Sequence, residues 1–270
     1  MAKATKKNQG YKVTIAVLCA IIILQWIFIA NILKPKEVVA PPKPPVPPKI
    51  EVKGKIAIVL DDWGYNEADV QVVVRLRYPL TIAVLPNLPY SRYVADELHQ
   101  KGFEIILHLP LQPQEKFRLE KNTILTSMSQ PAVSKIIAVA LESVPSASGV
   151  SNHMGSRATS DISTMGIVLG ELKKRRLYFL DSFVSASSVA QEVAQKNGVR
   201  FAKRDIFLDN KTDAAYIKNQ LYKLKVKAHL FGSAIGICHD RAIMLEVLRE
   251  MMPKLEKEGY KFVFVSDLVR

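Results

Sequence analysis

Two adjacent carboxylates, Asp61 and Asp62, directly follow an apolar run at residues 56–60. Five consecutive apolar residues, most of them β-branched, predict a strand that is buried on both faces, and two charged side chains cannot follow it into a core. The pair is therefore expected at a rim. Neighbouring carboxylates repel each other, so one stays ionised while the other takes up a proton or is neutralised by a cation. The two residues could divide metal binding and general-base catalysis, or they could be a helix N-cap followed by a solvated acid.

Three of the five histidines, His108, His153 and His239, also follow runs that predict strands. Asp62, His108 and His153 together would make a site of two histidines and one carboxylate, which suits Zn²⁺ and is compatible with other divalent ions. Three protein ligands leave positions open for water and substrate. An ion in such a site lowers the pKa of a bound water from about 15.7 to about 7 and polarises a carbonyl oxygen. The predicted reaction is metal-assisted hydrolysis.

Further polar residues at the predicted strand ends could complete the site. Asp61 would act as general base, and His239 across the rim could protonate the leaving group as general acid. Arg204 could orient the base by a bidentate contact, and Asp181 could hold a histidine in its working tautomer. Asn152 completes the set of candidate supporting residues. For these supporting residues, a rim salt bridge or a cap is an equally good interpretation.

The elements that must position these residues alternate along residues 55–270 between apolar strands and helical patterns. Such alternation implies a parallel sheet with right-handed crossovers. Seven or eight units fit a deformed parallel β/α barrel better than an open sheet, and the carboxyl ends of its strands converge on one face. Strands are expected at residues 55–60, 80–85, 104–107, 147–151, 177–180, 199–202, 234–238 and 261–265. Helices are expected at residues 65–76, 90–101, 131–144, 162–176, 186–196, 213–225 and 241–258.

Residues 13–33 form an apolar segment without any charged residue. As a helix this segment is long enough to cross a hydrocarbon core of about 30 Å. Four lysines and no acidic residue precede it, which predicts a cytoplasmic N-terminus and a translocated remainder. A cleavable signal peptide is the competing interpretation, but the segment is longer than a usual signal-peptide core. We therefore expect an uncleaved single-pass anchor in a bacterial inner membrane, with the barrel in the periplasm.

The chain divides into four predicted parts. Residues 1–12 are a basic cytoplasmic N-terminus, residues 13–33 the transmembrane anchor, residues 34–54 a Pro-rich linker and residues 55–270 the barrel domain. Residues 34–48 contain seven of the fifteen prolines. This composition favours an extended polyproline-II spacer.

Charge and cysteine content exclude two classes of protein. Residues 1–55 contain ten lysines and two glutamates, so only +5 of the net charge of +13 belongs to the rest of the chain. So small an excess is not the footprint of a nucleic-acid-binding protein. Cys19 lies in the apolar segment and Cys238 far from it, so a disulfide framework is not expected.

Six segments of the chain resemble the divergent polysaccharide deacetylases, relatives of the carbohydrate esterases that share the NodB-type deformed barrel. The resemblance extends over nearly everything after the linker. It rests on residues 56–64 (IAIVLDDWG), 81–86 (TIAVLP), 104–113 (EIILHLPLQP), 149–156 (GVSNHMGS), 179–182 (FLDS) and 236–239 (GICH).

The resemblance implies a role for each matched residue. Asp61 is similar to the family's base, Asp62 and His108 to its metal ligands, and His239 to its acid, while His153 fits the third ligand. Ordinary polysaccharide deacetylases instead place two metal histidines after one strand, and their arginine-proline-tyrosine segment is not recognisable here.

The implied activity is metal-dependent deacetylation of an acetylated envelope polysaccharide, such as a peptidoglycan-like glycan, with Zn²⁺ as the expected ion. A glycan-binding or scaffolding protein that keeps the barrel without the reaction is the alternative. A metal phosphoesterase is a third interpretation, but the sequence has no Gly-rich phosphate cradle.

Overall fold

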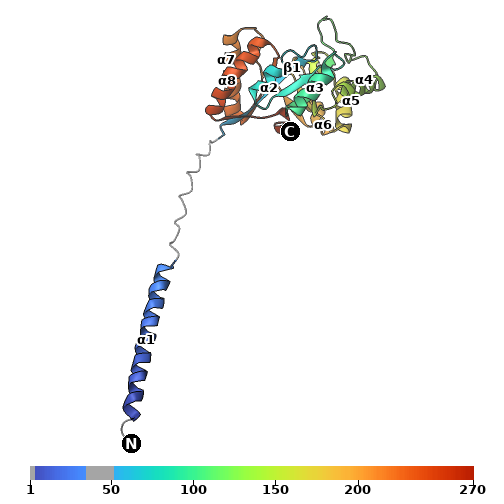
Figure 1. Ribbon diagram of the computed structural model, residues 1–270. Coiled ribbons are helices and arrows are strands. Elements are labelled where there is room, and N and C mark those ends of the chain that lie inside the picture. Colours follow the sequence, from blue (N-terminus) through green and yellow to red (C-terminus); the bar gives the residue numbers. More distant parts are fainter. Residues whose placement is uncertain (1–3, 35–51) are drawn as a thin grey trace. The chain divides into compact units, whose positions relative to one another are not determined.

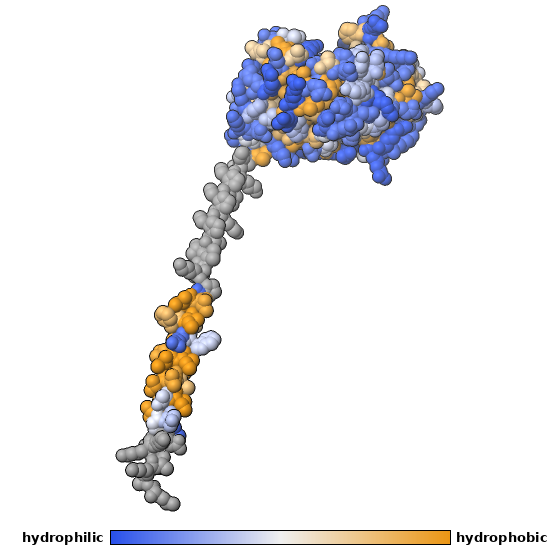
Figure 2. Space-filling model, in the orientation of Figure 1, coloured by the Kyte–Doolittle hydropathy of each residue, from blue (hydrophilic) through white to orange (hydrophobic). Residues whose placement is uncertain are grey.

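The structure, a computed structural model, describes residues 4–34 and 52–270. It divides the chain into two units, Met1–Lys49 and Ile50–Arg270. In the first unit the described residues form the helix α1 (Ala4–Ile32), of which Gly10–Ile32 is long and apolar enough to cross a membrane, as is also true of signal sequences. Hydrophobic side chains cover most of the coloured part of this helix in Figure 2, whereas the face of the second unit that the figure shows is largely hydrophilic. Most of the predicted Pro-rich linker, residues 35–51, lies outside the described residues.

A curled parallel sheet forms the centre of the second unit (Figure 1). Its strands follow one another in the order β6-β5-β4-β3-β2-β1-β8-β7, and β9 pairs with the amino-terminal end of β1. Every strand pair is parallel, as the alternation of strands and helices predicts. The strands are β1 (Gly54–Trp63), β2 (Thr81–Val84), β3 (Glu104–Leu111), β4 (Gly149–Met154), β5 (Tyr178–Asp181), β6 (Phe201–Lys203), β7 (Ile206–Phe207), β8 (Ser233–His239) and β9 (Tyr260–Phe262).

The two edges of the sheet are joined by consecutive residues of the chain. β6 pairs with β5 at one edge and β7 pairs with β8 at the other. Between them, the Arg204 N–H donates to the Asp181 carbonyl at 3.0 Å and the Asp205 N–H donates to the Ile235 carbonyl at 2.9 Å. The chain thus passes directly from one edge to the other, which curls the sheet into the predicted deformed barrel. The sequence did not predict β7, because polar residues interrupt the apolar run and only two residues pair.

Helices cover the outside of the sheet and bury its outer face (Figure 1). The sequence predicts seven helices in this unit and all seven are present, with ends that differ by up to six residues. α2 starts at Val70 rather than at residue 65, since Asp62 and Gly64 have φ values of 67° and 120° and the chain turns there. The helices are α2 (Val70–Leu76), α3 (Ser91–Gln100), α4 (Gln130–Ser143), α5 (Ile162–Lys174), α6 (Ala190–Asn197), α7 (Ala214–Phe231) and α8 (Ala242–Lys257), with 3₁₀ turns η1 (Ala158–Ser160) and η2 (Val265–Asp267).

Two apolar clusters divide the residues of each strand between them. In β1, Ile56, Ile58 and Leu60 pack outward against the helices, whereas Ala57 and Val59 pack inside the barrel. Both sets are fully buried, as predicted for an apolar run without alternation. This parity decides which side chains beyond Leu60 face the barrel axis.

Candidate active site

Asp61 and Asp62 lie on the same side of β1, although they are consecutive residues of a strand. Asp61 continues the inward set, and regular alternation would turn Asp62 outward against the helices. A register shift prevents this, because the step from Leu60 to Trp63 on β1 lies opposite the step from Ile82 to Val84 on β2. The extra residue is a β-bulge, and Asp62 takes up the left-handed conformation within it. The bulge returns the Asp62 carboxylate to the rim.

The two predicted metal histidines come from neighbouring strands and meet at Asp62. His108 lies in the second half of β3, which continues to Leu111 instead of ending at residue 107 as predicted, and His153 lies near the carboxyl end of β4. Both side chains are on the inward side of their strands. Asp62 Oδ1 is 3.3 Å from His108 Nε2 and 3.0 Å from His153 Nδ1. The three ligand atoms lie within 4.8 Å of one another. Two imidazole nitrogens and one carboxylate oxygen at these separations fit a divalent ion of the Zn²⁺ type.

A hydroxyl group that the sequence did not single out orients His108. Ser151, which precedes His153 by two residues on β4, places its Oγ 2.7 Å from His108 Nδ1. Metal-binding histidines commonly use their second ring nitrogen in this way, which fixes the ring and its tautomer. The sequence signal that could have identified Ser151 is its spacing of two residues from His153, which places both side chains on the inward face of β4.

The electrostatics of the cluster separate the two carboxylates. Burial raises the pKa of Asp61 well above its ordinary value, and the nearby charges of Asp62 and Asp209 raise it further. Burial also pulls the pKa of Asp62 upward, but hydrogen bonds with His108 and His153 outweigh this effect and lower it. Burial lowers the pKa of His108 to about 4, so its imidazole is neutral near pH 7 and can bind a cation. Of the two, Asp61 is therefore the carboxylate that takes up a proton more readily, and Asp62 is the one that stays ionised.

His239, at the end of β8, is held by a buried carboxylate that the sequence did not indicate. Asp209 Oδ2 lies 3.1 Å from His239 Nδ1 and accepts a hydrogen bond from the His239 backbone N–H at 3.1 Å. The other ring nitrogen, Nε2, lies 3.5 Å from Asp62 Oδ2. Burial lowers the pKa of His239, but Asp209 outweighs this and raises it overall. The arrangement favours a protonated imidazole that faces the rim.

Asn152 and Asp181 hold the backbone beside the cluster. The Asn152 side chain accepts a hydrogen bond from the Ser182 N–H at 2.8 Å, and Asp181 accepts from the Phe183 N–H at 2.8 Å and from the Ser188 hydroxyl at 2.6 Å. Within the described residues Asp181 has no hydrogen bond to a histidine. The expectation that Asp181 fixes a histidine tautomer is thus not met, because its oxygens close the turn after β5, and Asp209 takes that position instead.

Arg204 also differs from its expected role. Its Nε and Nη2 donate to the carbonyls of Ser182 and Phe183, at 2.6 and 2.8 Å, so its donors are used on backbone rather than on a bidentate contact with the base. Its charge nevertheless acts on Asp61, whose pKa it lowers against the larger effect of burial. One oxygen of Asp61, Oδ1, is buried without a hydrogen-bond partner in the described part of the chain.

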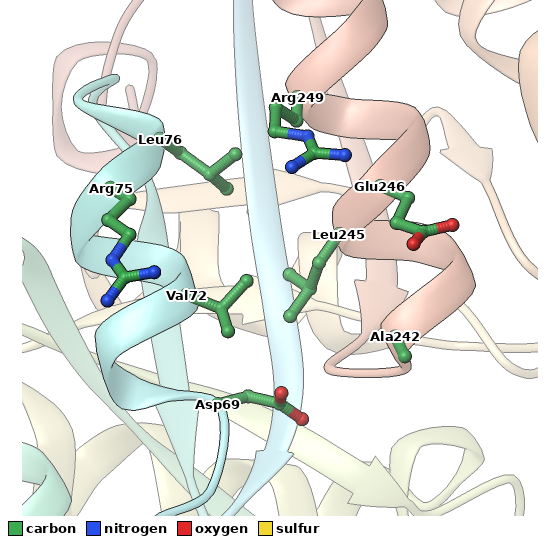
Figure 3. Close-up of a pocket in the computed structure, with 8 residues that line it drawn as sticks. All are labelled: Asp69, Val72, Arg75, Leu76, Ala242, Leu245, Glu246 and Arg249. Atoms are coloured by element: carbon green, nitrogen blue, oxygen red, sulfur yellow. The ribbon is translucent and has the colours of Figure 1, made fainter.

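Two surface hollows differ in their relation to the cluster. The first has a volume of about 220 Å³ and includes Asp62 and His239 in its lining. The second, of about 270 Å³, lies between α2 and α8, where Val72 and Leu245 point toward each other (Figure 3), and its lining includes none of the predicted site residues. The first hollow is therefore the one that adjoins the cluster. Its lining residues are Asp62, Tyr65, Asn66, His239, Asp240 and Arg241.

Comparisons with known proteins identify the family of the chain, and solved structures share its fold. The model of the family described as "Divergent polysaccharide deacetylase" matches residues 58–269. The protein YibQ of Escherichia coli K12 is 39% identical over 202 residues, which cover 75% of this chain and 63% of that protein, so the chain spans less than two thirds of this relative.

Two solved structures share the fold at low identity. A protein of Agrobacterium tumefaciens C58, ATU2773, has a TM-score of 0.77 and 23% identity, with 82% of this chain and 91% of that chain covered. The peptidoglycan deacetylase PdaC from Bacillus subtilis has a TM-score of 0.51 and 15% identity, with 83% and 92% covered. At these identities the likeness shows the fold alone, which is that of the NodB-type barrel.

Proposed function

The chain belongs to the divergent polysaccharide deacetylase family, and on this premise we propose that it is a metal-dependent deacetylase of an N- or O-acetylated envelope glycan. The observation that carries the proposal is the bulge in β1, which sets Asp61 and Asp62 side by side against His108. The geometry is supported by the pKa values of the two carboxylates, which shift in opposite directions at one imidazole. Such a separation of pKa values is typical of acid–base catalysis.

In this proposal Asp62, His108 and His153 hold the divalent ion, and their donor types favour Zn²⁺. When bound, the ion lowers the pKa of a water and polarises the acyl carbonyl. Asp61 takes the proton from the attacking water while the oxygen of that water bonds to the acyl carbon. The unpartnered Oδ1 of Asp61 and its raised pKa suit this role, because the group must accept a proton and then hold it.

His239 completes the reaction at the other side of the cluster. As the C–N or C–O bond breaks, the leaving amine or alkoxide needs a proton, and the His239 Nε2–H supplies it. Asp209 stabilises the protonated imidazole and fixes its orientation through Nδ1. The hollow lined by Tyr65, Asn66 and Asp240 lies beside His239, so the leaving sugar would occupy it.

The helix α1 is proposed to be the membrane anchor of this enzyme, with residues 34–54 as linker and the barrel in the periplasm. The apolar length of Gly10–Ile32 and the preceding lysines support this arrangement. Full-length protein in the membrane fraction should resist alkaline carbonate extraction. Release of a shortened chain that begins after residue 33 would instead identify a cleaved signal peptide.

A direct test uses purified residues 50–270, whose hydrophobic core contains no residue of α1. The domain, loaded with Zn²⁺, should release acetate from acetylated peptidoglycan fragments or from O-acetylated polysaccharide. Asp61→Asn should abolish the release while the ion stays bound. A domain that binds the glycans but releases no acetate, and whose binding is unchanged by Asp61→Asn, would refute the enzyme and support the glycan-binding alternative.

A further inference from the structure

The amino-terminal end of the barrel exposes large apolar side chains. Leu230 and Phe231, at the end of α7, are 68% and 72% exposed, and Val52, just before β1, is 53% exposed. Gly232 follows in a left-handed conformation and ends the helix. Large apolar side chains that lie close together and are more than half exposed indicate a candidate interaction surface.

Three exposed lysines lie beside these side chains, two of them on strands and one just before a strand. Lys55 of β1 and Lys261 of β9 are register partners, and Lys53 immediately precedes β1. Like charges opposite each other on neighbouring strands destabilise a sheet. None of the three lysines forms a salt bridge with another residue of the described ranges 4–34 and 52–270. They lie outside helices, so the preference of cations for helix carboxyl ends does not account for them.

Backbone hydrogen bonds join the apolar and basic residues into one surface. The Lys55 N–H donates to the Gly232 carbonyl at 2.9 Å, directly beside Phe231, and the Lys53 N–H donates to the Gly259 carbonyl at 2.9 Å, close to Lys261 in sequence. Gly54 lies against the backbone of Ala228 in α7, where even a Cβ atom would clash. We call this surface the tether-end patch. It consists of Val52, Lys53, Lys55, Leu230, Phe231 and Lys261.

The tether-end patch lies where the chain enters the barrel. Seventeen residues, 35–51, separate it from the described end of the α1 segment. A chain of that length spans at most about 60 Å. If α1 is anchored as proposed above, the patch is therefore held within reach of the bilayer surface.

We propose that the tether-end patch binds the surface of an anionic phospholipid bilayer. Leu230, Phe231 and Val52 would enter the headgroup region, and the three lysines would contact lipid phosphates, a combination typical of interfacial binding. Since the patch is at the amino-terminal ends of the strands, docking would turn the carboxyl-terminal rim with Asp61 and His239 away from the bilayer. The proposal rests on the membrane anchoring given under the proposed function, but not on the deacetylase reaction.

Sedimentation of residues 50–270 with lipid vesicles tests the proposal. The domain should bind vesicles that contain phosphatidylglycerol and phosphatidylcholine, and should bind pure phosphatidylcholine vesicles at least tenfold more weakly. Binding should weaken in 0.5 M NaCl, because salt screens charge interactions at a surface. The same binding to both kinds of vesicle, or to neither, would overturn the proposal.

Matched variants assign the binding to the patch. Combined Lys53→Glu, Lys55→Glu and Lys261→Glu should weaken binding at least tenfold, and so should Leu230→Asn with Phe231→Asn. As a control, Lys116→Glu, Lys121→Glu and Lys211→Glu make the same change in charge on loops that follow β3 and β7, at the opposite end of the barrel, and should leave binding unchanged. Circular dichroism melting curves check that each variant folds.

The oligomeric state and the acetate release of the variants distinguish bilayer binding from other roles of the patch. If the wild-type domain is a dimer by analytical ultracentrifugation, and Leu230→Asn with Phe231→Asn makes it monomeric without changing vesicle binding, a second copy occupies the patch and the proposal fails. Acetate release from soluble glycan by the patch variants should equal that of the wild type. Loss of vesicle binding and loss of deacetylation are thus measured independently.

Discussion

Asp61 and Asp62 approach the same atom, His108 Nε2, at 3.7 and 3.3 Å, although they are neighbours in one strand. This relationship exists because the bulge between Leu60 and Trp63 cancels the alternation of side chains along β1. As a result, Asp61 is buried and Asp62 is held by two histidines. The pKa of Asp61 is raised and that of Asp62 is lowered.

Asp62→Ala should remove the divalent ion. Wild-type residues 50–270 should hold about one Zn²⁺ per chain, and loss of the central carboxylate, which contacts both histidines, should weaken binding by at least 100-fold, more than loss of a supporting residue would. Inductively coupled plasma mass spectrometry and calorimetric titration measure this. His99→Ala, which removes an exposed histidine from α3, is the control and should retain the ion.

Asp61→Asn should separate metal binding from catalysis. The amide has the same shape as the carboxylate but cannot accept the proton of the attacking water, so kcat should fall by roughly 10²- to 10⁴-fold. The stoichiometry of the ion should stay at that of the wild type. A variant that keeps more than a tenth of wild-type kcat would exclude Asp61 as the base.

Ser151→Ala should weaken metal binding without unfolding the protein. The hydroxyl orients His108 through its Nδ1 at 2.7 Å, and loss of such an outer contact commonly costs 10- to 100-fold in affinity. Competition with a chromophoric chelator measures the affinity. Ser148→Ala, which removes a hydroxyl near the start of the same strand, should not change it.

Asp209→Asn should lower kcat while substrate binding and metal content remain. The side chain contacts His239 Nδ1 and lies 3.5 Å from Arg241 Nη1, but it contacts none of the three predicted metal ligands, so its charge acts on the protonated imidazole. A fall of roughly 10- to 100-fold in kcat with KM within a factor of three is expected. A fall in kcat that comes with a lower melting temperature and a raised KM would point to a structural role instead.

Glu171 should make stability depend on pH. Hydrogen bonds with Lys174 and Arg175 lower the pKa of this carboxyl to about 2. Its folded pKa lies below the unfolded value of about 4.3, so its contribution is complete above that value and is lost as the pH falls toward 2. Because both partners are partly exposed, the contribution is about 1 kcal/mol.

Thermal unfolding of the wild type and of Glu171→Gln at pH 7, 5 and 3 tests this. The wild type should be more stable at pH 7, by a few degrees in Tm, and the difference should shrink between pH 5 and pH 3. A difference that is constant over this range would show that the ion pairs do not stabilise the fold. Glu142→Gln, at an exposed position of α4, is the control.

The sequence alone predicted the parallel barrel and most of the rim, because both follow from local patterns. Apolar runs mark the strands, and a polar residue directly after such a run lies at the carboxyl end. Asp61, His108, His153 and His239 also share the inward parity of their strands, which the two apolar clusters make visible. The family resemblance added their expected chemistry.

Tertiary structure decided which of these residues touch. The bulge that returns Asp62 to the rim depends on pairing with β2, and the sequence of β1 does not contain that pairing. Asp209 follows a strand of two residues that exists only because β8 lies beside it, so no local pattern indicated this partner of His239. For Arg204 and Asp181 the sequence left open a contact with a catalytic group or a role as cap or rim salt bridge, and the structure uses their hydrogen bonds on the backbone around β5. Types and order of residues are local properties of the chain, whereas contacts between strand ends depend on register and closure, which involve distant segments.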